Sequence, residues 1–184
     1  MFFYSWWAAT ILLILPFWPL DWVWLISFDQ YPIFAGEEIM SQKAYGTCVS
    51  EVQDPLKFGV SREQANKISC FNRIFAEMWN SWESSSMKED VLNSGAAEYT
   101  FYDSVTGKPL FIVPRGRTLD DFFAESAKHG WPSFRDDEVV WENVRSLVNG
   151  EVVSVDGTHL GHNLPDIWDN RYCINLVNIA GNPV

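Results

Sequence analysis

The sequence has few cysteines, and they are not spaced for a scaffold. Cys48, Cys70 and Cys173 are the only three among 184 residues, and no C-x-x-C pair occurs. Three cysteines are too few to form a disulfide scaffold in a chain of this length, and a four-cysteine zinc site is excluded. A packed apolar core must therefore hold the fold, and hydrophobic residues make up 47% of the chain.

Basic residues are scarce as well. The chain has 13 lysines and arginines against 24 aspartates and glutamates, so its formal net charge is -11. An acidic surface repels the phosphate backbone of nucleic acids, and we expect no nucleic-acid partner. No lysine or arginine precedes Lys43. The positive charges that orient a membrane segment are therefore missing on its N-terminal side.

A long apolar run opens the chain. Residues 2–28 carry one charge, Asp21, and are long enough to cross a hydrocarbon layer of roughly 30 Å. The tryptophans over residues 18–24 suit a membrane interface, whereas Pro16 and Pro19 would kink or end a helix. We expect an N-terminal hydrophobic helix that anchors the chain in a membrane or serves as a signal for a secretory or organellar location. A cleaved signal, an interfacial or buried arm and a cytoplasmic location are the alternatives.

The pattern of breakers and apolar residues divides the chain into three regions. Residues 1–30 are the anchor or signal, 31–97 a linker with an amphipathic helical extension, and 98–184 the main domain. In the extension, Ser61 and Gln64 form a capping box. Apolar residues follow it with helical spacing and predict a helix with one apolar face. These residues are Ala65, Ile68, Phe71, Ile74, Phe75 and Met78.

Short strands and turns dominate the main domain. A turn at residues 106–109 predicts a hairpin of residues 99–102 and 110–113. Residues 119–128 predict an amphipathic helix with acidic side chains in its first turn. Further strands are expected at residues 139–144, 151–155 and 171–179. This pattern indicates an α+β fold, a small and mainly antiparallel β domain or open barrel with flanking helices.

One stretch near the C-terminus concentrates reactive side chains. His159 and His162 could act as acid or base near neutral pH, and Asp166 could orient one of them. Arg171 would favour the thiolate of Cys173 if the two are close in space. A nucleophile, a proton donor and an orienting group are what covalent catalysis needs.

Two plainer interpretations stay open at this point. A cysteine between tyrosine and isoleucine on a strand is more often a small buried hydrophobic residue. His159 and His162 with Asp166 could instead ligate a metal ion through two imidazoles and a carboxylate.

Three short motifs follow one another in the main domain. They are GWPSF at residues 130–134, HLGH at 159–162 and RYCIN at 171–175. In order and sense they resemble the motifs of B-type methionine-(R)-sulfoxide reductases, and FYDSVTGKPLF at 101–111 looks like the opening hairpin of that family. The resemblance covers roughly residues 98–182 and favours Cys173 as a nucleophile over a core residue.

The resemblance implies a mechanism. Cys173 would attack the sulfoxide sulfur, and His162, with His159 nearby, would protonate the departing oxygen. A sulfoxide oxygen leaves poorly until it is protonated, and general acid catalysis of this kind contributes about 10²–10⁴-fold. Arg171 would favour the thiolate.

The resemblance also implies supporting residues. Asp166 and Asn175 would hold a hydrogen-bonded network of water or imidazole. Trp131 would receive the methyl group of the substrate on its ring face, and we count Phe134 of the same motif with the substrate site.

The sequence departs from the family at the resolving cysteine, where His129 stands just before the Gly-Trp pair. A sulfenic acid on Cys173 condenses readily with a second thiol, and only Cys48 and Cys70 remain. We favour Cys70 because it lies on the expected helix, whereas Cys48 in the linker has reach but no fixed position. An external thiol could also reduce Cys173 directly.

A second departure concerns zinc. The cysteine pairs that bind zinc in many relatives correspond here to Asp103 with Thr106 and to Val153 with Asp156. Valine cannot ligate a metal ion, so we expect no structural zinc and no other cofactor.

Two functional hypotheses follow. The first is a tethered or secretory-pathway reductase that acts on oxidised methionine, free or in proteins, with a thioredoxin-like electron donor. The second is a non-catalytic binding module of the same fold, which the N-terminal hydrophobic segment would dock onto a membrane assembly. The retained set of reactive motif residues favours the enzyme.

Overall fold

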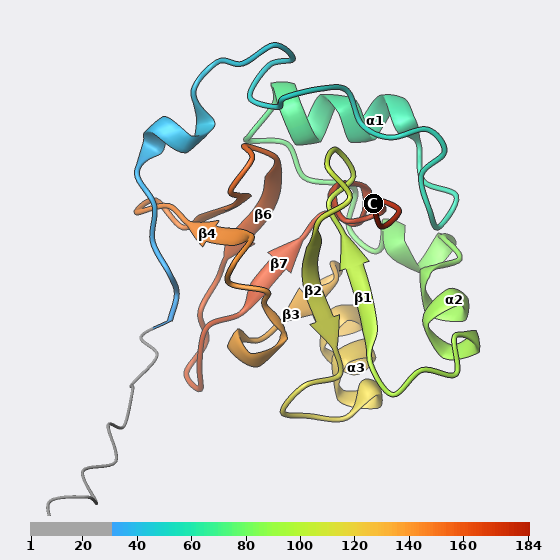
Figure 1. Cartoon of the computed structure of the whole chain (residues 1–184). Helices are drawn as coiled ribbons and strands as arrows, with labels where there is room; N and C mark the ends of the chain where they lie inside the picture. Colours follow the sequence, from blue (N-terminus) through green and yellow to red (C-terminus); the bar gives the residue numbers. More distant parts are fainter. Residues whose placement is uncertain (1–30) are drawn as a thin grey trace, which may run out of the picture.

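The computed structural model describes residues 31–184 (Figure 1). The hydrophobic helix expected over residues 1–30 lies outside the described residues. Within residues 31–184, no helix combines the length and apolarity that crossing a membrane requires.

Two antiparallel sheets form the centre of the described part of the chain. The larger has the strand order β3-β7-β6-β5-β4, and the smaller pairs β1 with β2. The α+β class and the antiparallel pairing are as predicted. The strands of the larger sheet are β3 (Ser133–Phe134), β4 (Val144–Ser146), β5 (Glu151–Ser154), β6 (His159–Asn163) and β7 (Tyr172–Ile174).

The predicted hairpin and the predicted helix of the main domain are both confirmed. β1 (Tyr99–Tyr102) and β2 (Pro109–Val113) pair around the expected turn. α3 (Leu119–His129) begins at a capping box in which the Thr118 hydroxyl accepts from the Asp121 backbone N–H. It ends at Gly130, whose φ of 84° is the left-handed conformation that glycine adopts most easily.

The helix predicted from Ser61 is much shorter than expected. The Ser61 hydroxyl accepts from the backbone N–H of Gln64, as predicted. However, the helical stretch consists only of α1 (Arg62–Asn66) and the π-helical turn η3 (Lys67–Phe71) that follows it, and it ends at Phe71. The remaining apolar positions are exposed: Phe71, Ile74, Phe75 and Met78.

Long-range hydrogen bonds explain why the helix stops. Beyond η3 the chain is irregular, with turns at residues 73–74 and 79–80, and the backbone N–H of Glu77 donates to Oδ1 of Asn175 at 2.9 Å. The Glu77 carbonyl accepts from the indole Nε1 of Trp131 at 3.1 Å. Tertiary contacts of this kind override the weak preference of local sequence for helix.

Two other strand predictions need correction. Residues 139–144 are mostly irregular, and β4 begins only at Val144. In this stretch Trp141 donates its indole N–H to the Asp136 carbonyl. Residues 171–179 form a strand only at Tyr172–Ile174, and the chain then turns into the 3-10 helix η6 (Leu176–Asn178). The strand predicted at 151–155 is confirmed as β5.

Residues before Tyr99 contribute to the main core. The rings of Phe101, Phe111, Phe122 and Phe134 form an aromatic centre, and Phe58, Trp82 and Met87 belong to the same buried cluster. α2 (Met87–Asn93) supplies Met87 and Val91. Figure 1 shows α1 above the strands, α3 below them and α2 to their right. The shorter 3-10 helices are η2 (Glu37–Met40), η4 (Ser81–Ser84) and η5 (Asp136–Glu138).

Cys48 and Cys70 form a disulfide inside a second, smaller apolar cluster with Val52, Ala65 and Ile68. Both sulfurs are buried, and the bond closes a loop with a sequence separation of 22. The disulfide therefore ties η3 to the segment that precedes α1.

Replacing both Cys48 and Cys70 by alanine should lower the free energy of unfolding by about 3 kcal/mol, the loop-closure entropy expected for a loop of this size. Urea denaturation measures the difference. Dithiothreitol should destabilise the wild-type chain by a similar amount and leave the double variant unaffected, with Cys173→Ala as the matched control. Equal stability of the wild-type chain and the double variant would contradict a stabilising role of the Cys48–Cys70 disulfide.

Candidate active site

Cys173 lies at the centre of a row of polar side chains that crosses the larger sheet. On β7 it is the direct partner of His162 on β6 and of Ser133 on β3. His162 is in turn the partner of Glu151 on β5. Directly opposed residues of antiparallel strands place their side chains on the same face, so all four lie side by side. The Ser133 hydroxyl oxygen is 3.9 Å from the Cys173 sulfur.

An irregularity between β5 and β6 adds His159 to this face. Residues three apart on a regular strand point to opposite faces. The register shifts between Val152 and Val153, which places an extra residue on β6. His159 and His162 therefore come together, with ring centres 5.5 Å apart.

His159 is fully buried and is held by a carboxylate. Its Nδ1 lies 2.7 Å from Oε1 of Glu151, which also accepts from Nε of Arg73 at 3.0 Å. Burial alone would raise the pKa of Glu151, but hydrogen bonds from His159 and Arg73 bring that pKa below its ordinary value. An ionised carboxylate only accepts hydrogen bonds, so Nδ1 of His159 carries the proton. Its Nε2 is buried and has no hydrogen-bond partner among residues 31–184.

The imidazole of His162 faces the cavity beside Cys173. Burial lowers its pKa, the nearby charge of His159 lowers it further, and Glu151 partly opposes both effects. The neutral form of His162 is therefore favoured near neutral pH, and Glu151 makes protonation of this ring easier.

Arg171 reaches Cys173 directly. Its Nη1 lies 2.5 Å from Sγ of Cys173, and its guanidinium is largely buried. A guanidinium N–H that donates to sulfur stabilises negative charge on that sulfur. Cys173 is the one free cysteine of the chain and is partly exposed.

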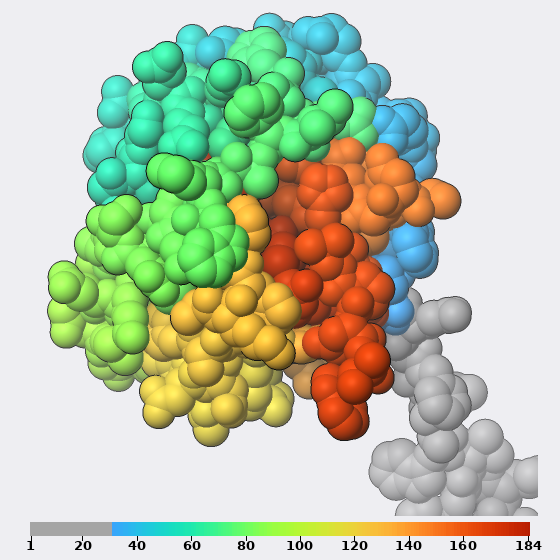
Figure 2. Space-filling view, turned by 180° about the vertical axis from the view of Figure 1, so that it is seen from behind, coloured from blue at the N-terminus to red at the C-terminus, as the bar shows by residue number. Residues whose placement is uncertain are grey.

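A pocket of about 240 Å³ opens above Cys173. In Figure 2 it is part of the hollow between the green, orange and red segments. The lining combines the Cys173 thiol and the His162 imidazole with apolar walls. The lining residues are Ala76, Trp131, Gly161, His162, Leu164, Cys173 and Asn175.

Sequence reasoning missed Glu77, which fixes two of these lining residues. Its backbone binds Asn175 and Trp131, as described above, and its carboxylate accepts from the Val177 backbone N–H at 3.3 Å. Burial raises the pKa of Glu77 to about 7, although backbone N–H groups and Ser81 partly oppose the shift. The available signal was an acidic residue in the middle of the apolar positions of the supposed helix.

Three predicted site residues lie elsewhere. The Asp166 carboxylate is exposed and paired with Nη2 of Arg135 at 2.7 Å, which lowers its pKa. Phe134 is fully buried and stacks on Phe111 with ring centres 4.2 Å apart, so it does not face the pocket. Cys70 is bonded to Cys48 and is not among the residues that line the pocket.

The positions that the resemblance aligns with zinc ligands of B-type reductases make other contacts. Asp103 is fully buried and accepts from the Thr158 hydroxyl at 2.9 Å. Asp156 pairs with Nζ of Lys108 at 2.8 Å, and Val153 is buried. Hydrogen bonds and an ion pair thus join the β1–β2 hairpin to the turn between β5 and β6.

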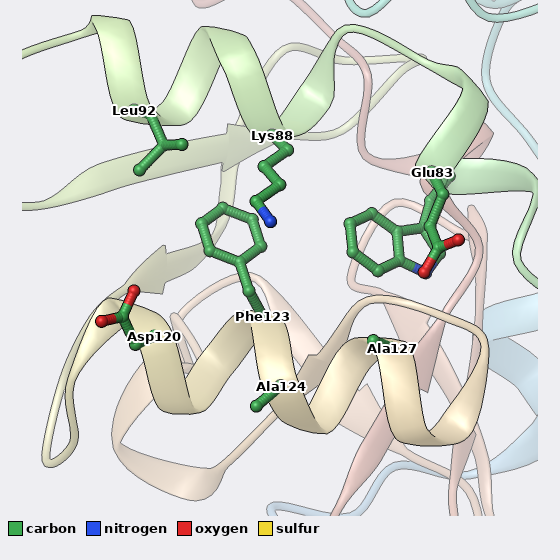
Figure 3. A pocket seen from close by; sticks show the side chains of 8 residues that line it. Glu83, Lys88, Leu92, Asp120, Phe123, Ala124 and Ala127 are labelled. Atoms are coloured by element: carbon green, nitrogen blue, oxygen red, sulfur yellow. The ribbon is translucent and has the colours of Figure 1, made fainter.

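A larger cavity of about 480 Å³ lies away from this chemistry, between α2 and α3. Figure 3 shows Lys88 and Phe123 pointing toward one another across it, and the Lys88 ammonium is 5.3 Å from the ring centre. None of its lining residues is a cysteine or histidine.

Comparisons of the chain with models of known protein families and with curated proteins found no match. The resemblance to B-type reductases therefore remains a prediction from the motifs.

Replacing Glu77 by glutamine should change how stability depends on pH. The Glu77 carboxyl has a pKa of about 7 in the folded chain and an ordinary pKa of 4.5. Its protonation therefore stabilises the folded state fully below pH 4.5, and this contribution to the free energy of unfolding is lost as the pH rises through 7. Relative to Glu77→Gln, the wild-type chain should lose up to about 3 kcal/mol between pH 4.5 and 8. Urea denaturation at both pH values checks this. The exposed Glu83→Gln should follow the wild type; parallel pH profiles for Glu77→Gln and wild type would refute the assignment.

Proposed function

We propose that this chain reduces methionine-(R)-sulfoxide to methionine, with Cys173 as the nucleophile. The observation that supports it best is one pocket that a free thiol, an imidazole and an indole line, with a largely buried guanidinium bonded to the thiol from outside the lining. These groups are a nucleophile, a proton donor, an anion stabiliser and an apolar wall, and each has a part in the reaction.

The Cys173 thiolate attacks the sulfoxide sulfur while His162 gives a proton to the sulfoxide oxygen. The attack joins the Cys173 sulfur to the substrate sulfur. The protonated oxygen then passes to the Cys173 sulfur while the substrate sulfur–oxygen bond and the new sulfur–sulfur bond both break, so methionine leaves and Cys173 becomes a sulfenic acid. The substrate sulfur gains two electrons, and the Cys173 sulfur loses two. A thioredoxin-like dithiol restores the thiol: its first sulfur displaces water to form a mixed disulfide, and its second sulfur releases Cys173.

Glu151 and Arg73 position the acid. Arg73 fixes the Glu151 carboxylate, and the carboxylate fixes the tautomer and ring plane of His159. The His159 ring lies edge-on to the His162 ring, with ring centres 5.5 Å apart. In this way Glu151 and Arg73 would fix the ring against which His162 lies and so help to orient His162 toward the sulfoxide oxygen.

Trp131 is suited to receive the methyl group of the substrate. Its indole N–H is already bound to the Glu77 carbonyl, so the ring is held in place. A fixed aromatic face is an apolar, polarisable wall for a methyl group attached to sulfur. The two antiparallel sheets would correspond to the open barrel of that family, and residues 1–30 would tether the enzyme to a membrane or direct it there.

Cys173→Ser should abolish reduction of the R epimer of a methionine sulfoxide peptide, because serine cannot carry the oxygen as a sulfenic acid. The assay follows methionine release from separated R and S epimers with a thioredoxin-like donor. A dimedone adduct should form on Cys173 after a sulfoxide challenge. Cys48→Ala with Cys70→Ala should retain R-epimer reduction at a temperature where it is folded. Activity that survives in Cys173→Ser would falsify the proposal, and a binding module would form no adduct.

Glu151→Gln should lower kcat/KM about tenfold or more and move the basic limb of the pH profile to lower pH. Removing the carboxylate charge takes away the influence that raises the pKa of His162. Initial rates between pH 5 and 9 give the profile, with the exposed Glu38→Gln as control. A uniform loss of rate with an unshifted limb would indicate damage to the fold instead of a positioning role.

A further inference from the structure

Two segments on either side of the pocket expose large apolar side chains. We call them together the apolar rim, and several of its residues are almost fully exposed: Ile74 is 90%, Met78 79%, Ile167 88% and Trp168 83% exposed. The remaining members of the rim are Phe75, Trp79 and Leu164. A contiguous group of exposed apolar side chains often marks an interaction site, whereas single exposed apolar side chains are common on any protein surface.

The rim is continuous with the pocket of Cys173. Ala76 and Leu164 line the pocket itself, and Ile74 lines the adjoining cavity of about 360 Å³ that His162 shares. At the far end, Trp79 packs on Gly130, where a Cβ would lie 2.1 Å from the indole ring. In Figure 2 the green and red segments border the same hollow.

Three charged residues of the two segments are paired or buried. Arg73 binds Glu151 and Glu37, the Glu77 carboxyl is buried, and Asp166 pairs with Arg135. Salt bridges and burial thus offset these three charges, whereas Asp169, next to Trp168, is exposed.

The pocket lacks partners for a free amino acid. The residues that line it include no Lys, Arg, Asp or Glu. A free methionine sulfoxide would bring an ammonium and a carboxylate next to this lining without compensating charges, which is costly. Inside a polypeptide the same atoms are neutral amides. The chemistry of the pocket therefore favours a methionine sulfoxide within a chain.

We infer that the apolar rim binds an extended polypeptide whose residues on either side of the oxidised methionine are apolar. This inference rests on the proposed function, because the sulfoxide must enter the Cys173 pocket while its neighbours contact the rim. Apolar neighbours gain by leaving water against Ile74 and Met78 on one side and Ile167 and Trp168 on the other. Acidic neighbours gain nothing there and are repelled by the negative net charge.

The test compares substrates with the full-length chain at one fixed concentration of a nonionic detergent. Acetylated and amidated pentapeptides carry a central methionine-(R)-sulfoxide flanked by leucine, serine or aspartate, and free methionine-(R)-sulfoxide is the fourth substrate. We expect kcat/KM for the leucine-flanked peptide to exceed that for the serine-flanked peptide at least tenfold. The aspartate-flanked peptide and the free amino acid should rank below both.

Variants then assign the preference to the rim. Met78→Ser and the pair Ile167→Ser with Trp168→Ser should each reduce the leucine-to-serine ratio at least threefold, and Val184→Ser, exposed at the C-terminus, should keep it. Urea denaturation shows whether each variant is folded. An equal ratio in wild type and rim variants would overturn the inference while leaving the reductase intact. Absence of turnover on every sulfoxide would overturn the proposed function and the inference together.

Two other occupants have distinct outcomes. If phosphatidylcholine vesicles abolish the leucine preference of wild type, lipid covers the rim, and the polypeptide assignment is overturned. If wild type forms a dimer in light scattering that the rim variants lose, a second copy covers it, with the same consequence. A monomer whose preference persists with vesicles supports the inference.

Discussion

The antiparallel pairing of β7 with β6 on one side and β3 on the other holds Cys173 between His162 and Ser133. Side chains alternate along a strand, so a slip of one residue would send the sulfur into the core and bring Tyr172 or Ile174 to the open face. Both of those side chains are fully buried in the aromatic core. Packing of the core and placement of the nucleophile are therefore set by one register.

The segment between η3 and η4 is as much a part of the site as the sheet. Its backbone meets Asn175 and Trp131 at Glu77, and Arg73 reaches the carboxylate behind His159. The disulfide at Cys70 fixes the start of this segment, and Trp79 against Gly130 fixes its end. A stretch that precedes the recognisable motifs thus supplies the wall and the rear support of the pocket.

Local signals predicted local structure well. The apolar spacing and acidic first turn of α3 and the turn between β1 and β2 are short-range features, and both elements formed within a residue of their expected bounds. The motifs also indicated Cys173, His162 and Trp131, which the fold brings into one pocket. Arg73, Glu77 and Glu151 escaped prediction because their roles depend on a strand irregularity and on contacts with residues far away in the sequence. For the same reason, apolar spacing after η3 suggested a buried helix face where the chain is irregular and its apolar side chains are exposed.

The disulfide has a consequence for the order of events at the nucleophile. With Cys48 and Cys70 joined to each other, the chain holds no second free thiol that could form a disulfide with an oxidised Cys173. The sulfur meets solvent through the pocket that the indole and Leu164 border. In the proposed reaction, the electron donor would have to reach Cys173 through the same opening by which methionine leaves. Reduction of the substrate and reduction of Cys173 would then have to alternate, and slow release of methionine would delay access of the donor.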